Sequence, residues 1–99
     1  MPRAYLISDV TAKDRDAFDH YRTHAAAAIA RFGGRYLVRG GTVETLEGEW
    51  RPSMVVIVEF PDIEAAQAWY RSPDYADALR FRDAALTRDL ILVEGIELP

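Results

Sequence analysis

Hydrophobic positions recur along the chain with two different periods, and each change of period marks a boundary between predicted elements. Four short stretches are aliphatic enough to form strands, at residues 3–10, 35–39, 54–60 and 89–94. A first helix is indicated by six apolar residues that share one helical side: Phe18, Tyr21, Ala25, Ala28, Ile29 and Phe32. A second helix follows Phe60, with an apolar side formed by Ala65, Ala66, Trp69 and Tyr70. The predicted order is therefore β-α-β-β-α-β.

Residues that begin and end helices stand at the expected boundaries. Thr11 or Asp14 can cap the first helix, and the pair at 33–34 can end it, because glycine adopts the left-handed conformation at low cost. Asp62 can cap the second helix. The sequence "SPDY" at residues 72–75 restarts that helix, with serine as cap and proline at the first helical position.

This order of elements in 99 residues predicts one domain over residues 1–99. Right-handed crossovers and short connections favour a ferredoxin-like α+β fold, in which an antiparallel sheet carries both helices on one face.

The predicted strands are apolar on both faces. A sheet covered on one side should alternate apolar and polar residues, but Val56 and Val58 alternate with Val55 and Ile57, and Leu90 and Leu92 with residues that are also aliphatic. Two helices cover only one face, and monomers rarely expose a large apolar patch. We therefore predict a homodimer packed through the open sheet face.

Charge and composition narrow the function. The net charge of −4 and the pI of about 5.1 disfavour a nucleic-acid partner. No cysteine is present for disulfides or thiolate metal sites. We find neither a signal peptide nor an apolar run of about 20 residues, so no membrane partner and a cytoplasmic location are expected.

Three segments resemble the small bacterial domain-of-unknown-function family numbered thirteen-thirty: "RFGGRYLVRGGTVETLEGEWRP", "VVIVEFPDIEAAQAWYRSPDYADALRFR" and "LILVEG". This family is grouped with the dimeric α+β barrels, in which two ferredoxin-like sheets close one barrel. The resemblance therefore implies the same fold and a dimer. The wider superfamily includes cofactor-free monooxygenases, lactone isomerases and haem-degrading enzymes. Membership of the family itself implies no particular activity.

The connection between the second and third strands is longer than a tight turn requires. The glycines at 40–41 suggest a bulge or bend, after which the chain leaves the sheet as a ribbon and returns near residue 51. Trp50 and Arg51 could cap a pocket or grip the partner subunit. Alternatively, the tryptophan packs on its own domain.

Charged residues offer two further hypotheses. Arg39, Arg51 and Arg82 could together bind a carboxylate. We favour the alternative that they are separate surface arginines, which pair with some of the chain's 16 acidic residues. Glu59 lies in an apolar strand, and the topology places it near Arg3 and Arg35. An ion pair explains it, and a buried base with a raised pKa is the alternative.

His20 and His24 lie one helical turn apart, as zinc-binding pairs do, but no third ligand is evident, so we predict neither a metal nor a cofactor. His24 near Tyr21 remains a candidate acid or base. Related barrels bind ligands between the second helix and the sheet, so the resemblance makes Trp69, Tyr70 and Tyr75 pocket candidates. Core packing is their alternative role.

Three functions follow. The first is a dimeric domain that binds a small acidic or aromatic molecule, and that could be an enzyme without a metal. His24, Tyr21 or Tyr70 would then handle protons and Arg39 or Arg51 would anchor the ligand. The second is a non-catalytic dimeric interaction module, and the third is a haem-handling enzyme. A polar-tipped cavity between the second helix and the sheet would favour the first function over the second.

Overall fold

The computed structural model describes residues 1–98. In this part of the chain there are four strands and three helices: β1 (Ala4–Ala12), α1 (Arg15–Arg31), β2 (Arg35–Arg39), β3 (Val55–Phe60), α2 (Ile63–Tyr70), α3 (Pro73–Ala85) and β4 (Leu86–Glu94). None of the three helices in these residues has the length and apolar character that a membrane span requires.

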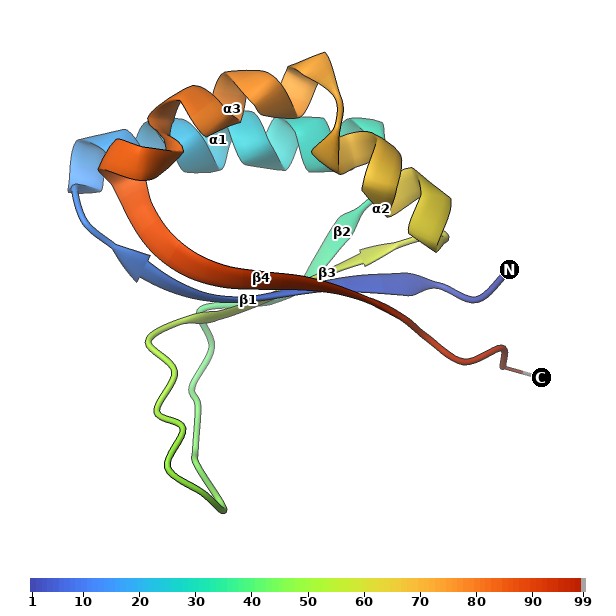
Figure 1. Cartoon of the computed structure of the whole chain (residues 1–99), viewed down its shortest axis with the longest axis horizontal. Coiled ribbons are helices and arrows are strands. Elements are labelled where there is room, and N and C mark those ends of the chain that lie inside the picture. The colour runs from blue at the N-terminus through green and yellow to red at the C-terminus, as the bar shows by residue number, and fades with distance from the viewer. Residues whose placement is uncertain (99) are drawn as a thin grey trace.

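The strands form one antiparallel sheet in the order β2-β3-β1-β4. All three helices lie on one side of this sheet, with α1 and α3 side by side and α2 at the end of α3 (Figure 1). The predicted ferredoxin-like fold is confirmed. The second predicted helix is two helices, α2 and α3, that meet at the predicted "SPDY" restart.

The predicted caps explain why the helices begin where they do. Asp14 Oδ1 accepts a hydrogen bond from the Ala17 amide at 2.8 Å, and Asp62 Oδ1 accepts one from the Ala65 amide at 2.7 Å. Ser72 caps α3 in the same way, with proline next to it at the first helical position. After α1, Gly33 turns the chain with a φ of +79°.

One boundary differs from the prediction in a way that matters for the site. Strand β4 begins at Leu86, three residues before the predicted start at residue 89, and Leu86 pairs with Ala12 at the end of a lengthened β1. Leu86 continues the apolar pattern of α3, but its backbone is already extended. This early start places Arg88 inside the sheet.

The covered face of the sheet and the helices enclose the core. The largest fully buried side chains are Trp69, Tyr75, Phe60 and Val58. Gly34 lies so close to Ile29 and Phe60 that an added Cβ would stand 2.7 Å and 2.8 Å from their side chains. The turn between α1 and β2 is therefore packed tightly against the core.

The open face of the sheet is also apolar, as predicted from the strands. Ile7, Ile57 and Ile91 are register partners and form a row across three strands. Ile91, Leu37 and Val93 are 56%, 48% and 42% exposed.

Residues 40–54 form an arm that extends from the sheet on the side opposite the helices (Figure 1). The strand bulge lies between Tyr36 and Val38 rather than at the glycines, and Gly40 turns the chain into the arm with a φ of +76°. Asp9 holds the base of the arm, since its carboxylate accepts hydrogen bonds from the Ser53 amide and Trp50 Nε1.

Candidate functional site

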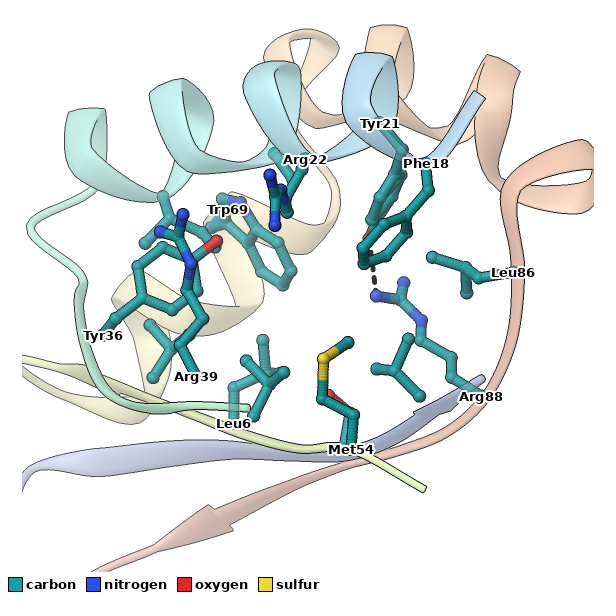
Figure 2. Close-up of a pocket in the computed structure, with 16 residues that line it drawn as sticks. Leu6, Phe18, Tyr21, Arg22, Tyr36, Arg39, Met54, Trp69, Leu86 and Arg88 are labelled. Atoms are coloured by element: carbon teal, nitrogen blue, oxygen red, sulfur yellow. Dashed lines mark hydrogen bonds between the residues drawn. The ribbon is translucent and has the colours of Figure 1, made fainter. Parts of the chain in front are cut away.

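An inner cavity of about 110 Å³ lies between α1 and the covered face of the sheet. Its wall is mostly apolar and includes Leu6, Phe18, Met54 and Leu86 (Figure 2). It lies chiefly beneath α1, whereas the sequence analysis looked for a cavity between the second helix and the sheet. Trp69 is the one residue of α2 that lines it.

Three polar side chains meet at the β4 end of this cavity. Tyr21 comes from α1, Tyr75 from α3 and Arg88 from β4. The two phenol oxygens are 2.6 Å apart, Arg88 Nη1 donates to Tyr21 Oη at 2.5 Å, and Arg88 Nη2 donates to Tyr75 Oη. Figure 2 shows the bond from Arg88 to Tyr21. We call Tyr21, Tyr75 and Arg88 the donor cluster.

The donor cluster has more hydrogen-bond donors than acceptors. Arginine only donates, and each phenol carries one hydrogen. The bond between the phenols uses one of the two phenol hydrogens, whichever ring donates, and both oxygens already accept from Arg88. Among the hydrogen bonds of residues 1–98, the second phenol hydrogen finds no acceptor. An additional oxygen acceptor would complete the cluster.

The positive charge of Arg88 is also unmatched. It is half-buried, and within the described chain no carboxylate forms an ion pair with it. Its guanidinium lies 5.4 Å and 5.9 Å from the ring centroids of Tyr21 and Tyr75. Burial lowers the pKa of Arg88, but the two phenols outweigh burial and raise that pKa, so the side chain stays charged.

The phenol of Tyr21 is neutral at physiological pH. Burial is the largest cause of its raised pKa, the neighbouring Tyr75 adds to it, and Arg88 opposes it. A phenol with a raised pKa is a poor base but an available hydrogen-bond donor. Tyr21 therefore suits donation to a ligand better than proton abstraction.

Trp69 adds another donor to the cavity wall. The residue is only 1% exposed, and its Nε1 has no hydrogen-bond partner among the described residues. Its ring packs on Tyr75 with centroids 4.2 Å apart. The candidates Trp69, Tyr21 and Tyr75 are therefore brought together as core residues, of which Trp69 and Tyr21 line the cavity and Tyr75 is fully buried behind it.

The β2 end of the cavity carries Tyr36, Arg39 and Arg22 (Figure 2). The Arg39 guanidinium lies 4.7 Å from the Tyr36 ring centroid. Burial raises the pKa of Tyr36, although the nearby charges of Arg39 and Arg22 oppose this. Arg39 thus lines the inner cavity, at the end opposite Arg88.

A second space adjoins the first at Arg88, which lines both. It has a volume of about 440 Å³ and lies between the end of α2, the last turn of α3 and the edge strand β4. Its polar lining consists of Gln67, Tyr70, Arg71, Arg82 and Arg88. We call it the arginine cleft. The candidates Tyr70 and Arg82 lie here, outside the inner cavity.

The other predicted residues lie apart from both spaces. His20 and His24 pack on Phe81 of α3, with ring centroids 5.6 Å and 5.4 Å away, so His24 does not meet Tyr21 in the cavity. Arg51 and Trp50 lie in the arm, where Trp50 is 64% exposed. Arg39, Arg51 and Arg82 therefore occupy three separate places in one protomer. In residues 1–98 no group of three or more His, Asp or Glu side chains could hold a metal.

Glu59 has the two neighbours that the topology predicted. Its Oε1 lies 2.8 Å from Arg35 Nε and 3.5 Å from Arg3 Nη1. Burial alone would raise the pKa of Glu59, but the hydrogen bond and charge of Arg35 lower it on balance. Glu59 is an ion-paired carboxylate, and the alternative of a base with a raised pKa is wrong.

Arg88 is the central residue that the sequence analysis missed. It lies just before the strand predicted at residues 89–94, and no role was predicted for it. With β4 starting at Leu86, the residues that alternate toward the helices are Leu86, Arg88, Leu90 and Leu92. A lone arginine among leucines at positions that face the core was the available signal.

Comparisons with known proteins agree with this fold. A family model described as "Domain of unknown function (DUF1330)" matches residues 3–96, which confirms the predicted family. No curated protein matches the chain.

Several solved structures are similar. The protein of unknown function RPA0582 from Rhodopseudomonas palustris has a TM-score of 0.77 at 22% identity, over 98% of this chain and 85% of that chain. SnoaB from Streptomyces nogalater, a cofactor-independent oxygenase, has a TM-score of 0.68 at 18% identity, over 99% and 97%. A dimeric ferredoxin-like protein of unknown function from Jannaschia sp. CCS1 has a TM-score of 0.62 at 15% identity, over 94% and 99%.

Proposed function

Because the chain belongs to the DUF1330 family, whose description assigns no activity, we propose its function from the site itself. The protein binds a small organic molecule in the inner cavity, and an oxygen of that molecule accepts hydrogen bonds from the donor cluster. The surplus phenol hydrogen beside the unpaired charge of Arg88 carries this proposal.

The size and lining of the cavity limit the ligand. An apolar cavity of about 150 Å³ in another protein holds benzene, so about 110 Å³ suits a molecule of roughly one ring. The apolar walls favour an aromatic or aliphatic body, and the donors favour a phenol, a phenolate or a carboxylate. A haem is far too large for this cavity, and neither His20 nor His24 lines it.

Phenol and toluene test this proposal, because they match in size and differ in one oxygen. We expect calorimetry to show phenol binding about tenfold or more tightly than toluene, since hydrogen bonds to charged groups contribute about 1.5–3 kcal/mol. Replacing Tyr75→Phe should reduce that preference. Equal affinities for the two compounds would refute the proposed role of the cluster.

The same proposal includes a homodimer through the open sheet face. The row of Ile7, Ile57 and Ile91 gives it an apolar centre, and the arm, with Leu46 82% exposed, extends on that side. The description of the similar Jannaschia protein as dimeric supports a dimer. Trp50 and Arg51 would then contact the partner subunit.

A second candidate function is oxidation of a bound phenol by O2 without a cofactor: a bound catechol would transfer two electrons and two protons to O2, which gives an ortho-quinone and H2O2. It is supported by the similarity to SnoaB and by the donor cluster, which would stabilise the phenolate through the charge of Arg88. An oxygen electrode tests it with catechol as the probe. We expect oxygen uptake above the protein-free rate that Arg88→Met abolishes, and equal rates would leave binding as the function.

A further inference from the structure

The arginine cleft concentrates positive charge in an acidic protein. Arg71, Arg82 and Arg88 line it, and none of the chain's 16 acidic residues does. Like charges held close together repel one another unless an anion lies between them. The cleft therefore has the electrostatic character of an anion site, although the chain as a whole carries a net charge of −4.

These charges are poorly satisfied within the protein. Arg82 Nη2 lies 3.3 Å from Asp83, but that carboxylate is 94% exposed, so the pair contributes little. The Nε of Arg82 is buried without a hydrogen-bond partner in the described part of the chain. Neither Arg71 nor Arg88 forms an ion pair with any of residues 1–98. Buried polar groups normally have partners, and Arg82 Nε lacks one.

The shape of the cleft indicates a ligand with an apolar body. Its volume of about 440 Å³ is four times that of the inner cavity and lies within the range of ordinary ligand pockets, about 300–1,000 Å³. Leu90, Leu92 and Ala66 form an apolar floor beneath the arginines. A bare inorganic ion would leave this floor unused.

We propose that the arginine cleft binds the carboxylate of an organic acid larger than one ring, through Arg71, Arg82 and Arg88. A guanidinium fork matches a carboxylate in geometry and charge. Arg71 follows the C-terminal end of α2, and Arg82 lies in the last turn of α3. Helix C-termini carry partial negative charge, which disfavours a dianionic phosphate more than a singly charged carboxylate.

Naphthoate tests the cleft separately from the inner cavity, because two fused rings exceed a space of about 110 Å³. Naphthylmethanol is its uncharged counterpart. Calorimetry should show naphthoate binding about tenfold or more tightly than naphthylmethanol. Arg82→Gln and Arg71→Gln should each remove most of this difference. Arg71 is exposed, so its replacement tests the site without disturbing the fold.

Arg80→Gln is the matched control, because Arg80 is an exposed arginine of the same helix that does not line the cleft. Equal binding of naphthoate and naphthylmethanol, unchanged naphthoate binding in both cleft variants, or tighter binding of naphthyl phosphate would each overturn the proposal. Phenol binding should be unaffected by Arg71→Gln. The two probes therefore distinguish a failure of the proposal for the cleft from a failure of the proposal for the inner cavity.

Discussion

The two faces of the sheet are both apolar, but among residues 1–98 the buried, unmatched polar groups lie on the covered side alone. Beneath α1, the donor cluster and Trp69 Nε1 border a cavity where further packing would have been more stable. The open face instead presents the isoleucine row of β1, β3 and β4, and its most buried charge, Glu59, is ion-paired.

Because of this difference, we assign ligand binding to the covered face and assembly to the open face. A cavity with unpaired donors has a cost in stability, and such a cost is typical of a functional site. A smooth apolar face with satisfied charges is typical of a surface that another protein covers. Changes on the open face should therefore alter association, whereas changes at the donor cluster should alter ligand affinity.

The largest effect is expected from Ile57→Asp on the open face. An unpaired charge buried in an interface costs about 3–5 kcal/mol, so the proposed dimer should dissociate at micromolar concentration. Sedimentation velocity would then show the 11.2 kDa monomer. Ala76→Asp, at an exposed position of α3, should leave the dimer intact. A wild-type protein that is already monomeric would refute the assembly.

A smaller effect is expected from Arg88→Met on the covered face. Losing charge-assisted hydrogen bonds should weaken phenol binding by roughly 10- to 100-fold. The free energy of unfolding should also fall, by about 1.5–3 kcal/mol, because the phenols of Tyr21 and Tyr75 lose the hydrogen bonds that charged Arg88 donates to them. Calorimetry and urea unfolding measure the two quantities. Unchanged affinity, with Arg80→Met as reference, would remove Arg88 from the site.

Alkaline pH should destabilise the folded protein through Tyr21, which lies on the covered side of the sheet. Its pKa is raised in the folded state, so the stability it contributes is present below the ordinary phenol pKa of 10.0 and is lost as the pH rises further. The slope is at most about 1.4 kcal/mol per pH unit. Tyr21→Phe should reduce this alkaline loss in urea unfolding. An identical pH dependence in the variant would contradict the assigned burial.

The smallest effect is expected from Glu59→Gln at acid pH. The pKa of Glu59 is lowered in the folded state, so its contribution is present above the unfolded value of about 4.5 and is lost as the pH falls below it. The variant should therefore lose less stability than the wild type on acidification. Glu64→Gln, an exposed carboxylate of α2, is the control. A steeper loss of stability on acidification in Glu59→Gln than in the wild type would contradict this prediction.

Much of the fold could be predicted because the features that determine it lie close together in the sequence. Hydrophobic period, the caps at Asp62 and Ser72 and the turn at Gly33 each depend on a few neighbouring residues. The two-faced strands followed from the same periodicity. The boundary at Leu86 could not be predicted, since one apolar residue fits the end of a helix and the start of a strand equally well.

The site was predicted only in part, because its geometry depends on distant residues. Tyr21, Trp69 and Tyr75 were candidates for separate reasons, but the contact between Tyr21 and Tyr75 joins residues 54 positions apart. Arg88 was missed because the predicted strand began after it, at residue 89, whereas β4 begins at Leu86. His24 was expected beside Tyr21, yet it faces Phe81 because a helix side can pack on another helix as well as on a sheet.

The pKa of para-nitrophenol bound to the protein tests the central claim most directly. This probe has one ring and one ionisable oxygen, and its phenolate absorbs visible light. If that oxygen lies against Arg88 and the surplus phenol hydrogen, binding must favour the phenolate, and a spectrophotometric titration will show a lower pKa than in water. A bound probe with an unchanged or raised pKa, or no binding at all, would contradict the account.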